Sequence, residues 1–217
     1  MPKFSLIEPR YSNDTSTNSQ SQGLEPNSNH PGAANYLGTG TKLSDSNPPI
    51  DVTYGELLLF DAYALLAASD YWEKTLLIIT YDEPGGLYDH VSPVAITKPA
   101  STTVGGSSVA IPSVDYTLDT AAHEFDYNVT GGPVPAIIVS PYVTQGSTIT
   151  APEGGQVFDH TSIIKTVWDI FQIEQNGGPA FLTQRDLNAP SLFGYLDFSK
   201  VNPAVQLPTV TPPAKPS

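Results

Sequence analysis

The sequence contains no cysteine, and this absence excludes disulfide bonds, thiolate catalysis and cysteine-ligated zinc or iron–sulfur sites. Basic residues are scarce: nine Lys and Arg stand against 22 Asp and Glu, which gives a formal net charge of −13. This balance argues against nucleic-acid binding, which needs clustered basic side chains to neutralise phosphates. No apolar run approaches the roughly 20 residues of a transmembrane helix, so we expect no membrane span. The first residues, MPKFSLIEPRY, also lack the pattern of a signal peptide.

Glycine and proline are abundant, with 17 and 21 copies, so we expect much of the chain to form loops. The length of 217 residues fits one domain, which we predict over residues 1–198. Residues 12–50 are rich in Ser, Asn, Thr, Gly and Pro and predict a long irregular segment. Residues 92–131 are weakly patterned and are interpreted as short strands or an irregular β excursion. The proline-rich residues 199–217 predict a disordered tail.

Two helices frame the regular part of the sequence. Thr53 and Glu56 have the spacing of a capping box, and GELLLFDAYALLAAS follows. This stretch is apolar on most faces and predicts a buried helix. A second helix is predicted after Asp159, with Thr161 or Ser162 as its N-cap. Its apolar residues fall on one face: Ile163, Ile164, Val167, Trp168 and Phe171.

Two apolar runs predict strands. TLLIITY, residues 75–81, lacks alternation, as in a strand covered on both faces, and VPAIIVSPY, residues 134–142, is similar. The order helix, strand, excursion, strand, helix is typical of an α/β sheet with helices on its faces. Sites in such folds gather at the carboxyl ends of strands. Asp82 and Glu83 stand at that end of the first strand.

Acidic residues and histidines stand side by side at three places: Asp82 with Glu83, Asp89 with His90, and Asp159 with His160. Carboxylate oxygens and imidazole nitrogens suit a divalent cation, and an Asp beside a His can bind the metal or support a ligand. A metal held in this way can polarise a phosphoryl oxygen and offset the charge that develops during displacement. The three pairs therefore indicate a candidate metal or catalytic site.

Each pair also has a purely structural interpretation. The first is compatible with a solvated turn, the second with a hydrogen-bonded turn, and the third with the N-cap of a helix. His30 stands in a low-complexity loop, where it need contact nothing. Spacing marks no nucleophile, because the chain has no Gly-x-Ser-x-Gly elbow, and it has no phosphate-cradling Gly-x-x-x-x-Gly-Lys loop.

The segment TLLIITYDEPGGLYDHV resembles the hallmark segment of the phosphoesterase family, which contains the non-haemolytic type of phospholipase C and a related acid phosphatase. This family belongs to the alkaline-phosphatase-like superfamily. Further segments agree in order: FSLIEPRY, NSNHP, VPAIIVSPYV, FDHTSIIKTV and LTQRDLNAP. The resemblance spans most of residues 4–190. It implies part of an alkaline-phosphatase-like sheet with helices on both faces and long loops, and it makes residues 1–198 the C-terminal part of a phosphoesterase domain.

The resemblance also implies a divalent metal ion and a phosphate ester substrate, with phospholipid as one possibility. In this family the adjacent acids at the strand end lie in the active site, and the His of the His-Pro motif lies near the substrate phosphate. The predicted metal ligands are Asp82, Glu83 and Asp159. The predicted catalytic residues are His30, His90 and His160.

In two places the sequence departs from the family pattern. Pro84 replaces the His of Asp-Glu-His-Gly-Gly, and Gly132-Pro133-Val134-Pro135 lacks the Arg of Gly-x-Arg-Val-Pro. Family members also begin with a strand and a Glu-Asn metal-binding pair, followed by a Ser or Thr nucleophile. No residue of this chain can be matched to these features, so the chain resembles only the C-terminal half of the enzyme.

The resulting hypothesis is a metal-assisted hydrolase of phosphoric ester bonds, of the phospholipase C or acid phosphatase type. The alternative is a catalytically inactive fragment or pseudoenzyme that retains the fold and a weak cation site. A third reading is a secreted glycoprotein with a binding role. It rests on the acidity and on two sequons, Asn13-Asp14-Thr15 and Asn128-Val129-Thr130.

Overall fold

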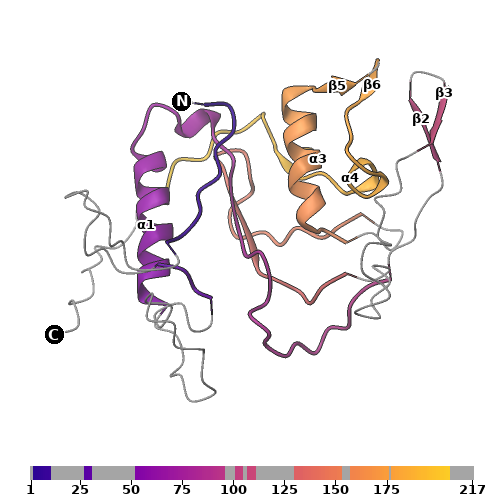
Figure 1. Ribbon diagram of the computed structural model, residues 1–217. Helices are drawn as coiled ribbons and strands as arrows, with labels where there is room; N and C mark the ends of the chain where they lie inside the picture. Colours follow the sequence, from indigo (N-terminus) through magenta and orange to yellow (C-terminus); the bar gives the residue numbers. More distant parts are fainter. Residues whose placement is uncertain are drawn as a thin grey trace, which may run out of the picture. The chain divides into compact units, whose positions relative to one another are not determined.

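The structure is a computed structural model, shown in Figure 1, and the residues that it describes are 2–10, 27–30, 52–95, 101–104, 107–110, 130–152, 157–175 and 177–205. The chain divides into two compact units. The first contains Met1–Ile79, Ile138–Pro141 and Val201–Ser217, and the second contains Thr80–Ile137 and Tyr142–Lys200. The elements are mixed α and β, as the sequence predicts.

The first unit contains helix α1, Thr53–Ala67, followed by a short 3₁₀ helix, η2, at Trp72–Lys74. The N-cap of α1 is Val52, whose carbonyl oxygen accepts a hydrogen bond from the Glu56 N–H at 2.9 Å. Val52 provides no side-chain hydrogen bond, and Thr53 already lies inside the helix. The predicted capping box of Thr53 and Glu56 is therefore wrong, because the helix begins one residue too early for that pairing.

Helix α1 is less buried than its composition predicts. Within the helix only Gly55 is buried, and Leu65 is 74% exposed. The hydroxyl of Tyr63 donates to the carbonyl of Val205 at 3.0 Å, and the Tyr63 and Trp72 rings meet edge to face at 5.9 Å. The indole N–H of Trp72 donates to the carbonyl of Asn202 at 3.2 Å. Residues 201–205 therefore run against this aromatic pair, while residues 206–217 of the predicted tail lie outside the described residues.

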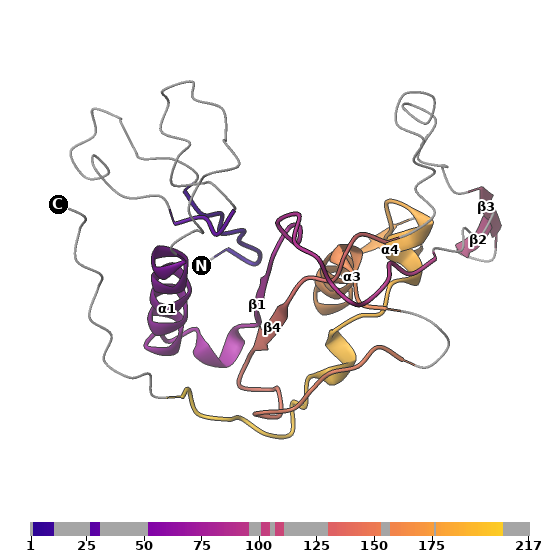
Figure 2. The ribbon, with the colours of Figure 1, turned by 90° about the horizontal axis from the view of Figure 1, so that it is seen from below.

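The two predicted strands are present as β1, Leu77–Thr80, and β4, Ala136–Val139, and they are neighbours in a two-stranded sheet (Figure 2). All four residues of β1 are half-buried, and β4 begins exposed and ends half-buried. The positions of both strands are confirmed, but the predicted burial is wrong, because neither strand contains a buried residue and Ile137 of β4 is 56% exposed. The larger alkaline-phosphatase-like sheet, with helices on both faces, stays a prediction.

Side-chain hydrogen bonds at the two ends of this sheet give the direction of the strands. The hydroxyl of Thr80, the last residue of β1, donates to the carbonyl of Pro135 just before β4, at 3.0 Å. The hydroxyl of Ser140, just after β4, donates to the carbonyl of Thr75 just before β1, at 2.9 Å. The strands therefore run in opposite directions, and the carboxyl end of β1 lies beside the start of β4.

The second unit contains two short antiparallel hairpins. Strands β2, Ser101–Val104, and β3, Ser107–Ala110, form the first and confirm short strands at these residues. Residues 96–100, 105–106 and 111–129 of the predicted excursion lie outside the described residues. Strands β5, Glu174–Gln175, and β6, Gly178–Pro179, form the second. Antiparallel pairing allows each hairpin to close through a short connection.

The helices of the second unit are α3, His160–Phe171, and α4, Gln184–Asn188, followed by a 3₁₀ helix, η4, at Phe193–Tyr195. Thr166 of α3 is 0% exposed. Its hydroxyl donates to the Ser162 carbonyl at 2.6 Å and accepts from the Leu192 N–H at 2.8 Å. A buried polar contact thus joins α3 to the segment after α4, and the predicted apolar face of α3 is half-buried around it.

None of the helices in the described part of the chain combines the length and the apolar character needed to cross a membrane.

Candidate active site

The acidic pair follows β1 directly and begins a tight turn. Asp82 and Glu83 are both exposed, and the Gly85 N–H donates to the Glu83 carboxylate (Oε2) at 2.6 Å. Gly85 and Gly86 have φ values of +72° and +68°, a region that glycine occupies without steric penalty. No hydrogen bond or ion pair to the Asp82 side chain is found among the described residues. The turn therefore engages the Glu83 carboxylate and leaves that of Asp82 facing solvent.

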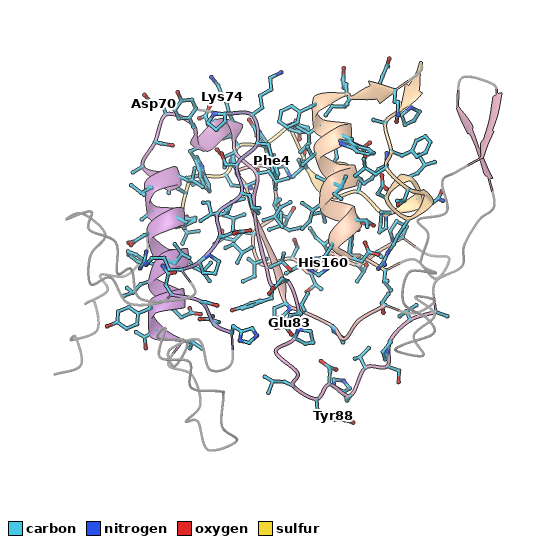
Figure 3. All side chains as sticks on the ribbon, in the orientation of Figure 1. Phe4, Asp70, Lys74, Glu83, Tyr88 and His160 are labelled. Carbon is cyan, nitrogen blue, oxygen red and sulfur yellow. The ribbon has the colours of Figure 1, made fainter. Side chains whose placement is uncertain are left out.

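His160, the first residue of α3, lies against this turn. Its Nε2 atom is 2.8 Å from the carbonyl oxygen of Tyr81, the residue that precedes Asp82. A carbonyl oxygen can only accept, so Nε2 must carry the proton, and Nδ1 of the neutral ring keeps its lone pair. Glu83 and His160 are labelled in Figure 3. The structure therefore joins two motifs that are far apart in the sequence.

Asp159 is the N-cap of α3. Its Oδ1 atom accepts from the N–H of Thr161 at 2.7 Å and from the Thr161 hydroxyl at 2.5 Å. In return, its own N–H donates to the hydroxyl of Ser162 at 3.2 Å, which completes a capping box. The predicted choice of Thr161 or Ser162 as the cap is wrong, because the Asp159 side chain reaches the free N–H groups of the first turn. The structural interpretation of the Asp159–His160 pair as part of an N-cap is confirmed.

The second oxygen of the Asp159 carboxylate accepts from Nε of Arg185 in α4, at 2.9 Å. Partial burial raises the pKa of Asp159, but the hydrogen bonds from Thr161 and Arg185 and the charge of Arg185 outweigh it and hold the pKa below the ordinary value of 3.8. Asp159 is therefore a carboxylate engaged on both oxygens. Its predicted role as a metal ligand stays a prediction, and a metal ion there would share the carboxylate with these donors.

The Asp89–His90 pair is a local turn. The Val91 N–H donates to Oδ1 of Asp89 at 2.7 Å, and Nδ1 of His90 lies 3.4 Å from the same oxygen. The His90 side chain is 89% exposed, and the described residues give its ring no other hydrogen bond or ion pair. The structure therefore holds His90 only through its sequence neighbour, and its catalytic role stays a prediction.

His30 belongs to the first unit. It is exposed, and its N–H donates to the hydroxyl of the buried Ser28 at 3.1 Å. The N–H groups of Asn27 and Ser28 both donate to the carbonyl of Arg10, at 3.0 and 3.1 Å, which ties this segment to the N-terminal residues. His30 is thus carried by an anchored segment, and its role near a phosphate stays a prediction.

The described residues contain no group of three or more His, Asp or Glu side chains able to hold a metal ion. Asp82 nevertheless fits one ligand position, because it offers anionic oxygens to which no donor among the described residues is bonded. The acidic pair therefore fits part of a cation site, and further ligands would have to complete it.

Sequence reasoning missed two contacts at the site. Arg185 gave no local signal, because it pairs with an Asp 26 residues away in the chain. Gly132 and Pro84 also lie together: Cγ of Pro84 is 3.3 Å from the position that a Cβ on Gly132 would take. Both departures from the family pattern therefore fall at one place, beside the acidic turn.

The profile of the Phosphoesterase family matches residues 1–174. The chain belongs to the phosphoesterase family, as the segment TLLIITYDEPGGLYDHV predicts. It is 30% identical to "Non-specific phospholipase C6" of Arabidopsis thaliana over 218 residues, which cover 98% of the chain and 34% of that protein. It is 35% identical to "Non-specific phospholipase C4" of the same organism over 149 residues, which cover 67% of the chain and 24% of that protein.

A bacterial relative is "Phospholipase C A" of Mycobacterium tuberculosis, 33% identical over 126 residues, which cover 58% of the chain and 22% of that protein. The chain thus spans about a third or less of each of these relatives.

Proposed function

We propose that this chain is part of a metal-assisted hydrolase of phosphoric ester bonds, of the phospholipase C or acid phosphatase type. The observation that carries the proposal is the 2.8 Å contact between Nε2 of His160 and the carbonyl of Tyr81. This contact places the His160 imidazole, which can transfer a proton, next to the residue that precedes Asp82 and Glu83. Family membership and relatives named as phospholipases C support the reaction class.

In the proposed site, Asp82 is a metal ligand and Glu83 is a further ligand or a supporting acid. The metal supplies Lewis-acid polarisation of a phosphoryl oxygen when it is bound. Glu83 already accepts the Gly85 N–H at 2.6 Å, so this hydrogen bond orients its carboxylate. The Asp82 carboxylate, which has no hydrogen-bond or ion-pair partner within the described part of the chain, is the more available ligand of the two.

His160 is proposed as the general acid or as a donor to the phosphoryl oxygens. With Nε2–H held by the Tyr81 carbonyl, the protonated ring presents Nδ1–H to the leaving-group oxygen and becomes neutral when it gives up this proton. His30 and His90 stay predicted catalytic residues. The nucleophile is proposed to be a Ser or Thr from the part of family proteins that has no counterpart here.

The proposed substrate is a phosphate ester, and phospholipid is the preferred class because the relatives are named as phospholipases C. Location outside the cell and glycosylation stay predictions, because Asn13 and Asn128 lie outside the described residues.

A second candidate function is a non-catalytic one, in which the chain retains the fold and a weak cation site. One observation favours it: the described residues contain no group of three or more His, Asp or Glu side chains that could hold a metal ion. The two candidates differ in whether the protein turns over any phosphate ester.

The test uses the longest polypeptide that the locus encodes, and the 217-residue chain beside it. Hydrolysis of p-nitrophenyl phosphate, p-nitrophenyl phosphorylcholine and phosphatidylcholine vesicles is measured with and without Mn²⁺ and Zn²⁺. Asp82→Asn should lower kcat by about 100-fold or more, since a ligand that stabilises the transition state is lost. The matched control is Asp70→Asn, another exposed carboxylate, which should leave kcat unchanged.

Calorimetric titration with Mn²⁺ should show weaker binding to Asp82→Asn than to Asp70→Asn. Near-normal turnover of Asp82→Asn would refute the role of Asp82. No hydrolysis of any substrate by the longest polypeptide would favour the non-catalytic function.

A further inference from the structure

We propose that Arg185 is a positioning residue for the candidate site: it holds the Asp159 cap of α3 from outside the helix, and this cap sets His160 against the carbonyl of Tyr81. The catalytic part of this inference rests on the proposed function, whereas the geometric part stands on the structure alone.

The Asp159 carboxylate is held from two directions. Its Oδ1 atom caps the helix through Thr161, and its Oδ2 atom accepts from Nε of Arg185 at 2.9 Å. The side chains of Asp159 and Arg185 are 18% and 37% exposed, so water competes only partly for this pair. Hydrogen bonds to an ionised group are stronger than neutral ones, so the pair limits rotation of the carboxylate.

The backbone that carries Arg185 is held in place by buried hydrogen bonds at the start of α4. It is the second residue of α4, whose N-cap Thr183 forms a capping box with Asp186. Asp186 is 2% exposed and accepts from the N–H groups of Leu182 and Thr183, at 3.0 and 2.6 Å. A buried carboxylate with these partners resists displacement, so the backbone that carries Arg185 has a defined place.

A second contact joins α3 to the segment that follows α4. The buried hydroxyl of Thr166, in the second turn of α3, accepts from the N–H of Leu192 at 2.8 Å. The chain around α4 therefore meets α3 at its start through Arg185 and further along through Leu192. Removing Arg185 should leave the second contact in place, so the expected effect is confined to the first turn of α3.

His160 is the residue that a shift of the first turn of α3 would displace most. It follows Asp159 directly, and its side chain is exposed, so its position depends on where the helix begins and on the bond to the Tyr81 carbonyl. Arg185 thereby influences a group that it does not touch. A shift of about 1 Å in a catalytic group can lower a rate by about 100-fold, which makes this dependence measurable.

The test compares three variants in the longest polypeptide of the locus. Arg185→Leu removes the donor and the charge. Arg185→Gln removes the charge but keeps an N–H donor at the same number of bonds from the backbone. Lys165→Met is the matched control, because it breaks the other ion pair of α3, Lys165–Asp169 at 2.6 Å, without touching the cap.

The first readout is independent of activity. Long-range ¹H–¹⁵N spectra of the imidazole rings report which nitrogen of His160 carries the proton. The parent protein and Lys165→Met should show the Nε2–H tautomer, and Arg185→Leu should show a mixture of both. An unchanged His160 spectrum in folded Arg185→Leu overturns the proposal.

The second readout is kinetic. We expect Arg185→Leu to lower kcat by about 10- to 100-fold with little change in KM, and Arg185→Gln to recover part of the loss. If Arg185→Leu fails to fold, Arg185→Gln must still disturb the His160 spectrum more than Lys165→Met does, or the proposal is overturned. If no phosphate ester is hydrolysed but the spectrum responds as expected, the positioning role stands and only the proposed function fails.

Discussion

Cγ of Pro84 lies 3.3 Å from the place where a Cβ would stand on Gly132. Pro84 follows the acidic pair, and Gly132 precedes the segment Pro133-Val134-Pro135 that leads into β4. The sequence departs from the expected family pattern at Pro84 and in the segment Gly132-Pro133-Val134-Pro135, and this contact joins one residue of each. Because β1 and β4 run in opposite directions, the end of one strand meets the approach to the other.

We predict that Gly132→Ala is neutral or destabilising in the parent chain and stabilising in Pro84→Ala. Alanine restricts the unfolded chain and so stabilises the fold by about 0.4–1 kcal/mol where there is room, but here its methyl group presses on the proline ring. Urea unfolding of the two single variants and the double variant should give an interaction free energy of about 0.5–1 kcal/mol. If the changes in unfolding free energy of the two single variants simply add in the double variant, the contact does not contribute to stability. Gly131→Ala is the control, since nothing lies within 4 Å of its would-be Cβ.

A second prediction concerns the segment that carries His30. A Cβ on Gly55, in the first turn of α1, would overlap the side-chain amide of Asn29. Alanine in a helix is ordinarily about 1 kcal/mol better than glycine, but Gly55→Ala should not give this gain, because the side-chain amide of Asn29 must move.

The double variant Asn29→Ala with Gly55→Ala tests this explanation. It should be more stable than Asn29→Ala alone, because the clash is gone and the helix propensity remains. The measurement is again urea unfolding. A loss of equal size in both backgrounds would place the cause inside the helix rather than at Asn29.

A third prediction follows from the lowered pKa of Asp159. A carboxyl group whose folded-state pKa lies below its unfolded value stabilises the fold fully above that value and loses this effect as the pH falls through the folded-state pKa. Asp159→Asn keeps a capping side chain but removes the charge that pairs with Arg185. At neutral pH the variant should be less stable by about 1 kcal/mol, since the pair is partly exposed.

The difference in unfolding free energy between the parent protein and Asp159→Asn should shrink as the pH falls below 3.8, the ordinary pKa of an Asp carboxyl group. Urea unfolding of both proteins between pH 7 and pH 2 measures it. The pKa of Asp197 is also lowered, by hydrogen bonds from Ser199. Asp197 is present in both proteins, so its contribution to the pH dependence cancels in the difference. A difference that stays constant or widens toward low pH contradicts the assignment.

Much of the local structure could be predicted because it depends on near neighbours. The apolar runs around residues 77–80 and 136–139 predict strands, and the structure has strands there. The acidic pair at the end of the first strand could be placed in the same way. The N-cap of α3 was placed wrongly by two or three residues, because Asp159, Thr161 and Ser162 all favour capping and only the backbone geometry decides among them.

The burial of α1 could not be read from composition. A helix that is apolar on most faces predicts full burial, yet Leu65 is 74% exposed. Composition reports which surfaces a helix can bury, whereas burial depends on what packs against it. The same limit applies to the site, since adjacent acids and Asp-His pairs mark candidates but carry no distances between them.

The sequence by itself determined the family, the α/β character, the two strands and the placement of Asp82 and Glu83 at a strand end, because each follows from a contiguous pattern of residue types. The tertiary structure alone decided that β1 and β4 oppose each other, that His160 meets the Tyr81 carbonyl and that Arg185 holds Asp159. These contacts join residues far apart in the chain, and their free energy depends on packing and on geometry that no local pattern encodes.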